Sequence, residues 1–118
     1  MRSALKRFAP FVLLLLLASC GEKTIDLGDG YKYVQLDGRN WAISDRDSLM
    51  VVDPDVTRRK VIGPFIVGER KNADIDEALS KKYGFFIFDK RSKELIEGLD
   101  GGAFESALLA RSLPEKPF

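Results

Sequence analysis

YKYVQLDGRNWAIS, residues 31–44, is the segment from which the architecture of this chain is most directly inferred. Two stretches of alternating apolar and polar residues flank the pair Asp37-Gly38. Asp-Gly in this position favours a two-residue type I′ turn and therefore a β-hairpin. In such a hairpin, facing residues of the two strands share a side of the sheet, and the alternation predicts an antiparallel sheet with one buried side. The expected buried side consists of Val34, Leu36, Trp41 and Ile43. The expected outward side consists of Tyr31, Tyr33, Gln35, Asn40 and Ala42.

Further strands are expected toward the C-terminus. Apolar residues favour strands at 49–52 and 60–70, with a polar loop at 53–59 between them. Gly63-Pro64 predicts an edge, bend or bulge within the second of these, because proline lacks the amide donor that a strand ladder needs. Residues 85–89 and 94–99 flank a polar turn, which predicts another hairpin.

Two segments have helical patterns. Residues 72–82, NADIDEALSKK, predict a short helix or, alternatively, a structured loop. A longer helix is expected over 102–113, capped by Asp100 and ended by Pro114. The predicted class is therefore α+β: a small, mainly antiparallel β-sheet of hairpins with a C-terminal helix packed on one face. The residues expected in its core are Val34, Leu36, Trp41, Ile43, Phe65, Val67, Phe86, Phe88, Phe104 and Leu108.

Composition narrows the function classes. The chain has 118 residues, of which 45% are hydrophobic, and this fits one small domain. Its 19 Lys+Arg and 18 Asp+Glu are balanced, which argues against a nucleic-acid partner. It has no His and one Cys, so Ser-His-Asp and Cys-His catalysis, most zinc sites and an internal disulfide are excluded. We expect no cofactor and no enzymatic activity.

The N-terminal residues have the pattern of a targeting segment. Basic residues at positions 2, 6 and 7 precede an apolar run, Phe8–Ala18. This run is shorter than the roughly 20 residues that a transmembrane helix needs, but it suits a secretory signal peptide. The run ends in Leu17-Ala18-Ser19-Cys20, where small residues precede the only cysteine.

Leu17-Ala18-Ser19-Cys20 resembles the lipobox of bacterial lipoproteins. The resemblance implies a diacylglycerol on the thiol of Cys20 and cleavage between Ser19 and Cys20; the alternative is an ordinary signal peptide in which Cys20 is incidental. The later part of the chain is similar to small bacterial lipoproteins with a domain of unknown function. In those proteins, as at Phe85–Lys90, an apolar strand ending in Asp-Lys precedes a polar turn, a closing strand and a C-terminal helix. This resemblance implies a membrane-anchored protein and assigns no activity.

The chain is accordingly divided into a signal peptide (1–19), a lipidated tether (20–30) and a single β-rich domain (31–118). The tether is polar and contains glycine, so we expect a flexible coil on the order of 15–20 Å. Residue 21 is Gly. In the lipoproteins that the motif resembles, Asp at this position signals retention in the inner membrane, so the resemblance implies the periplasmic face of the outer membrane in a diderm host.

Several groups of acidic residues and of basic residues are candidate binding sites. Asp45/Asp47, Asp53/Asp55 and Asp74/Asp76/Glu77 place carboxylates close together, as in Ca²⁺ sites, but none has the glycine that an EF-hand loop requires at its sixth position. Turn formation and helix capping are the simpler interpretation. Basic residues beside predicted turns form either a solvated rim or a patch for anionic headgroups or an acidic partner.

The favoured hypothesis is a non-catalytic module that binds another envelope protein, such as an immunity protein that inhibits a delivered toxin. Alternatives are a structural or assembly subunit of an envelope complex and, less favoured, a small-ligand sensor or an enzyme. Tyr and Arg are enriched in interface hot spots. The expected partner-binding residues are therefore Tyr31 and Tyr33 on the outward hairpin face, or Arg58, Arg59 and Lys60 in a basic turn.

Overall fold

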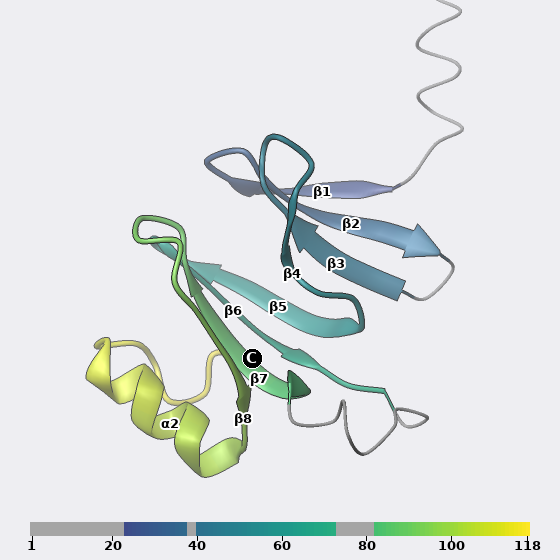
Figure 1. Ribbon diagram of the computed structural model, residues 1–118. Helices are drawn as coiled ribbons and strands as arrows, with labels where there is room; N and C mark the ends of the chain where they lie inside the picture. The colour runs from purple at the N-terminus through teal and green to yellow at the C-terminus, as the bar shows by residue number, and fades with distance from the viewer. Residues whose placement is uncertain (1–22, 38–39, 73–81) are drawn as a thin grey trace, which may run out of the picture.

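The computed structural model describes residues 23–37, 40–72 and 82–118 (Figure 1). In this part of the chain the strands form two four-stranded antiparallel sheets, each ordered as along the sequence, and α2 (Gly101–Ala110) follows the last strand. The first sheet consists of β1 (Thr24–Gly28), β2 (Tyr31–Asp37), β3 (Asn40–Ser44) and β4 (Met50–Val52). The second consists of β5 (Val56–Ile62), β6 (Phe65–Arg70), β7 (Gly84–Asp89) and β8 (Leu95–Leu99). The predicted α+β class is confirmed.

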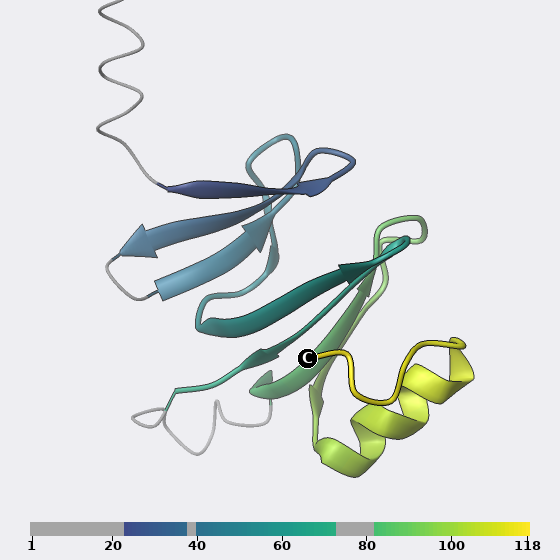
Figure 2. The same ribbon diagram turned by 180° about the vertical axis from the view of Figure 1, so that it is seen from behind.

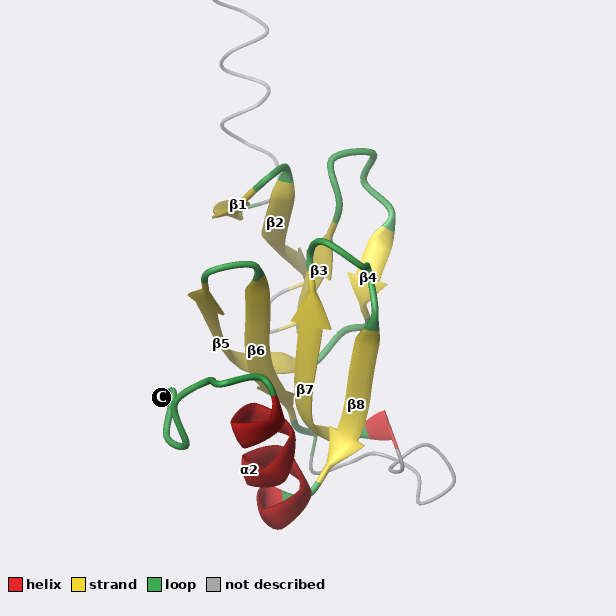
Figure 3. Cartoon of the chain, turned by 90° about the vertical axis from the view of Figure 1, so that its left-hand side faces the viewer, coloured by secondary structure: helices red, strands yellow, loops and turns green. Residues whose placement is uncertain are grey.

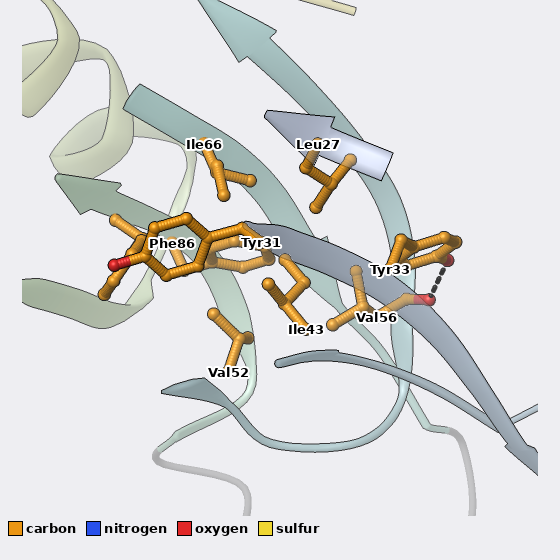
Figure 4. Packing of buried hydrophobic residues seen from close by; sticks show 9 residues of the cluster. Leu27, Tyr31, Tyr33, Ile43, Val52, Val56, Ile66 and Phe86 are labelled. Atoms are coloured by element: carbon orange, nitrogen blue, oxygen red, sulfur yellow. Dashed lines mark hydrogen bonds between the residues drawn. The ribbon is translucent and has the colours of Figure 1, made fainter. Parts of the chain in front are cut away.

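The second sheet is the middle of three layers (Figures 2 and 3). Successive residues of a strand point to opposite faces, so in β7 Phe86 and Phe88 pack toward the first sheet, whereas Ile87 packs toward α2. The core between the sheets contains Leu27, Tyr31, Tyr33, Ile43, Val52, Val56, Ile66, Phe86 and Phe88 (Figure 4). The core under the helix contains Phe65, Val67, Ile87, Phe104, Leu108 and Leu113.

The register of the first hairpin differs from the expected one. Tyr33 pairs with Ile43 and Gln35 with Trp41, and a bulge between Gln35 and Asp37 shifts the pairing near the turn. Residues 38–39, on which the type I′ turn was expected, lie outside the described residues. Because the side-chain period of a strand is two residues, a shift of one residue exchanges the two faces of the strand.

The exchange corrects the predicted core. Val34 and Leu36 lie on the side of the first sheet that faces away from the second sheet, and Leu36 is 37% exposed. Trp41 is partly buried and Ile43 is fully buried, so these two residues remain with the core. The remaining predicted core residues, Phe65, Val67, Phe86, Phe88, Phe104 and Leu108, are buried as expected.

Residues 24–28, predicted to be flexible tether, form strand β1 at the edge of the first sheet. Thr24 pairs with Val34 and Ile25 with Tyr33, so the expectation of a coil up to Gly30 is wrong. The alternation of polar and apolar residues in TIDL is the signal for this strand. The chain between Cys20 and the first sheet is consequently much shorter than the tether of residues 20–30 that the sequence predicts.

The C-terminal helix starts as predicted and ends earlier. The Asp100 carboxylate accepts a hydrogen bond from the Ala103 amide at 2.8 Å, which makes Asp100 the N-cap. At the other end Ser112 has a φ of 56°, its amide bonds to Leu109, and the Leu113 amide bonds to Leu108. This is a Schellman closure, which ends α2 before the proline is reached. The helix or loop predicted for 72–82 falls largely on residues 73–81, outside the described part of the chain.

Candidate interaction surfaces

Tyr31 and Tyr33 lie in the core between the sheets. Their exposed fractions are 6% and 7%. The Tyr33 hydroxyl donates a hydrogen bond of 2.7 Å to the Val56 carbonyl (Figure 4). The Tyr33 ring stacks on Trp41 with centroids 4.4 Å apart. Burial raises the pKa of Tyr33, although the nearby Arg59 guanidinium opposes this. The prediction that these tyrosines form an outward binding face is therefore wrong; a paired hydroxyl and two large rings are better accommodated between the sheets.

Arg58, Arg59 and Lys60 lie within strand β5 and not in a turn. Arg59 lies over the Tyr33 ring, 4.7 Å from its centroid, on the inner face. Arg58 and Lys60 belong to the opposite face, where Arg58 makes two hydrogen bonds of 3.0 and 2.7 Å to the Glu69 carboxylate and lies 4.9 Å from the Phe118 ring centroid. The three cations therefore do not form one basic patch. Lys60 is exposed, and half of the Arg58 side chain remains exposed.

A charged recess of about 350 Å³ lies where three connections meet: β1–β2, β3–β4 and β7–β8. We call it the loop recess. It is lined by Asp29, Tyr31, Asp45, Arg46, Asp47, Lys90 and Lys93. Residues with little exposed side-chain surface, such as Lys90, form the base of the recess. Exposed residues, such as Asp47 and Lys93, form its rim. Binding sites in β-proteins are often built on such loop clusters, because the sheets hold the loops in place.

Aspartates shape two of these connections. The Asp45 carboxylate accepts hydrogen bonds from the Asp47 and Leu49 amides at 2.9 and 3.0 Å. The Asp89 carboxylate accepts one from the Arg91 amide at 2.8 Å, and this bond, followed by weaker contributions from Ser92 and the Arg91 side chain, lowers the pKa of Asp89. These contacts confirm turn formation for Asp45.

Glycines make room for cations in the β1–β2 connection. Gly28 and Gly30 both have φ of 87°, a region that favours glycine. A Cβ at Gly30 would lie 2.9 Å from the Arg46 side chain, and one at Gly28 would lie 3.3 Å from Lys90 Nζ. The left-handed backbone and the missing side chains together let Arg46 and Lys90 approach this turn closely.

Lys90 links the two sheets at the base of the loop recess. Its side chain is only 6% exposed, and Nζ lies 3.0 Å from Asp29 Oδ2 and 3.3 Å from the Leu27 carbonyl oxygen. Its amide donates to the Pro64 carbonyl oxygen at 2.8 Å. Because a buried ammonium requires partners, these contacts hold the β7–β8 turn against the β1–β2 turn. Nothing in the local pattern around Lys90 distinguishes it from the exposed cations nearby.

A second polar cluster surrounds Arg70 at the crossover from β4 to β5. Its guanidinium donates to the carbonyl oxygens of Pro54 and Lys82 at 2.9 and 3.1 Å. Tyr83 packs against this guanidinium and donates a hydrogen bond to the Asp55 carboxylate. Burial and then the bond to Asp55 raise the pKa of Tyr83. These groups satisfy the backbone of the crossover, which is a structural role.

The outer face of the first sheet, directed away from the second sheet, is a further surface. It carries a hollow of about 180 Å³ lined by Thr24, Lys32, Val34, Leu36, Ser44, Ser48 and Met50. The equivalent face of the second sheet is covered by α2. We refer to this side of the first sheet, which no helix or strand of the described residues covers, as the outer face (Figures 1 and 2).

Ser19 and Cys20 lie outside the described residues. Within residues 23–37, 40–72 and 82–118, no helix is long and apolar enough to span a membrane. In the same ranges, no three potential metal-binding side chains come together. Comparison with known protein families, with curated proteins and with solved structures finds no match.

Proposed function

We propose that this protein is a membrane-anchored envelope lipoprotein, held by a lipid on Cys20, that binds another envelope protein and is not an enzyme. In a diderm host its place is the periplasmic face of the outer membrane. An immunity or inhibitor role fits the proposal, because anchoring a binding module at the membrane raises its effective concentration there.

The loop recess is the observation that carries the binding proposal. It combines a hollow large enough for side chains of a partner with both signs of charge on its rim, where Asp47 and Lys93 are exposed. Charge of both signs favours a partner with a complementary pattern over a simple anion or cation. The contacts of Lys90 and Asp45 hold the loops in place, so little conformational entropy is lost on binding.

The hydrogen bonds of four aspartates support a non-catalytic role. General acid–base catalysis needs a carboxyl group that is available to a substrate. Asp45, Asp89 and Asp100 instead accept hydrogen bonds from backbone amides, and Asp55 is held by Tyr83. With no His in the chain and its only Cys assigned to the lipid, the engagement of these four aspartates favours binding over chemistry.

The test is crosslinking of the full-length protein in cells that naturally produce it, followed by purification and mass spectrometry. We expect one stoichiometric protein partner, lost when the rim charges are reversed by Asp47→Lys and Lys93→Glu. Lys60→Glu is the matched control, because Lys60 is an exposed cation on β5 away from the recess. Loss of the partner with Lys60→Glu but not with the rim variants would place the contact on β5. It would refute the loop recess as the binding site.

Two other outcomes would favour the alternative functions. Recovery within one large envelope complex, insensitive to all three charge reversals, would favour a structural or assembly subunit. A rise in melting temperature with a small molecule, without any protein partner, would favour a ligand sensor.

A further inference from the structure

We infer that the outer face of the first sheet docks onto the lipid bilayer. This inference rests on the proposed lipidation of Cys20 and adds to it an orientation of the domain. The observations that carry it are the length of chain between the anchor and the sheet, the side chains on the outer face, and the absence of any covering layer over that face in the described part of the chain.

The position of Thr24 brings the anchor to this face. Thr24 pairs with Val34, and Val34 pairs with Ala42, so Thr24 belongs to a cross-strand row on the outer face. Only Gly21, Glu22 and Lys23 separate it from Cys20. Four residue steps span at most about 14 Å even when fully extended. A lipid on Cys20 is therefore held close to the outer face whatever path these residues take.

The side chains of the outer face suit the membrane interface. Three of the exposed large hydrophobic side chains in the described residues are Leu36 on β2, Met50 on β4 and Leu49 in the loop before β4, whereas Ile25 pairs with Tyr33 and so belongs to the inner side of the sheet. Leu36 and Met50 line the hollow of the outer face together with Val34. Exposed apolar side chains gathered on one surface mark an interaction site.

Lysines lie beside these apolar side chains. Lys32 shares a cross-strand row with Ser44, which pairs with Met50, and Lys23 is also exposed. Lysine stems pack along apolar surface while their ammonium groups reach lipid phosphates. Asp26 faces Lys32 in the same row, and its carboxylate accepts a hydrogen bond from the Gly28 amide. Apolar side chains with adjacent lysines are typical of surfaces that rest in the headgroup region.

A second copy of the chain is the competing occupant. The face contains Thr24, Ser44 and Ser48 as well as its apolar residues, and the hollow is only about 180 Å³. Stable dimers of identical chains bury large, mostly apolar areas. The short segment between Cys20 and Thr24 already holds the domain at the membrane. The geometry therefore favours the bilayer over a second copy of the chain as the occupant of this face.

The test measures the depth of labelled positions on the anchored protein. Full-length chains carrying Leu36→Cys or Met50→Cys are produced in a bacterium, purified from membranes and labelled on the new thiol with an environment-sensitive fluorophore. They are reconstituted into vesicles of phosphatidylethanolamine and phosphatidylglycerol, with or without a nitroxide-labelled lipid. Val61→Cys is the matched control, because Val61 is 38% exposed, close to the 37% of Leu36, and lies on the second sheet.

We expect labels at Leu36 and Met50 to lose most of their fluorescence to the nitroxide lipid and to resist aqueous iodide, whereas the label at Val61 shows the reverse. Equal iodide quenching at all three positions would overturn the docking. Protection from iodide without quenching by the lipid would also overturn it, in favour of a second copy over this face. Mass spectrometry of the same samples separates the two proposals. An unmodified Cys20 refutes the lipoprotein and the docking together, whereas a lipidated Cys20 with water-exposed labels refutes the docking alone.

Discussion

Replacing Tyr33 tests the register of the first hairpin, because the two possible registers predict opposite results. In the structure Tyr33 is buried, stacks on Trp41 and donates a hydrogen bond to Val56, which belongs to the other sheet. Had Tyr33 faced outward, its removal would change stability by less than about 0.5 kcal/mol, as for most surface positions.

Two substitutions separate the contributions of this side chain. Tyr33→Phe keeps the ring and removes the hydroxyl, which leaves the Val56 carbonyl without this donor and should cost about 1–2 kcal/mol. Tyr33→Ala also removes the ring, and its cost should approach the roughly 3–5 kcal/mol measured for buried aromatic residues. A domain of this size has only about 5–15 kcal/mol of stability, so the second variant should be close to unfolding at moderate temperature.

The assay is thermal and urea unfolding of Tyr33→Phe, Tyr33→Ala and a control, Leu36→Ala, monitored by circular dichroism. One kcal/mol corresponds to a shift of about 4–8 °C in Tm for a domain of this size. We expect Tyr33→Phe to lower Tm by roughly that amount or up to twice it, and Leu36→Ala to leave it nearly unchanged because Leu36 is on the outer face. A large loss with Leu36→Ala and none with Tyr33→Ala would refute the observed register.

Three further predictions are tested by standard measurements. Cys20→Ser should abolish membrane attachment and processing, and a Cys20→Ser protein that is cleaved and membrane-bound as before would contradict lipidation. Gly68→Ala should destabilise by about 1–3 kcal/mol or more, since a Cβ would overlap a β5 carbonyl oxygen and the Phe86 ring; urea unfolding checks this. Tyr33 and Tyr83 have raised pKa values, so the unfolded chain releases these protons first and stability should fall as pH rises above about 10. An absorbance titration in which all tyrosines ionise at the ordinary value would contradict the last prediction.

The candidate sites were only partly foreseeable from the sequence. The turn role of Asp45 follows from local chemistry, because its carboxylate reaches amides two and four residues ahead. The loop recess does not follow from local chemistry, because it joins connections as far apart along the chain as Asp29 and Lys90. The basic run Arg58-Arg59-Lys60 looks like one patch in sequence, but strand geometry places Arg59 on the inner face and its neighbours on the other.

The sequence by itself determined the features that depend on neighbours along the chain. The hairpins formed by β2 and β3 and by β7 and β8, the cap at Asp100 and the α+β class follow from alternation, turn residues and capping, which act over a few residues. The tertiary structure decided which face of the first hairpin is buried. That choice depends on the second sheet, where Val56 accepts the Tyr33 hydroxyl and Phe88 packs against Tyr31 at a centroid distance of 5.3 Å. Both partners lie more than twenty residues further along the chain, beyond the range of any local pattern.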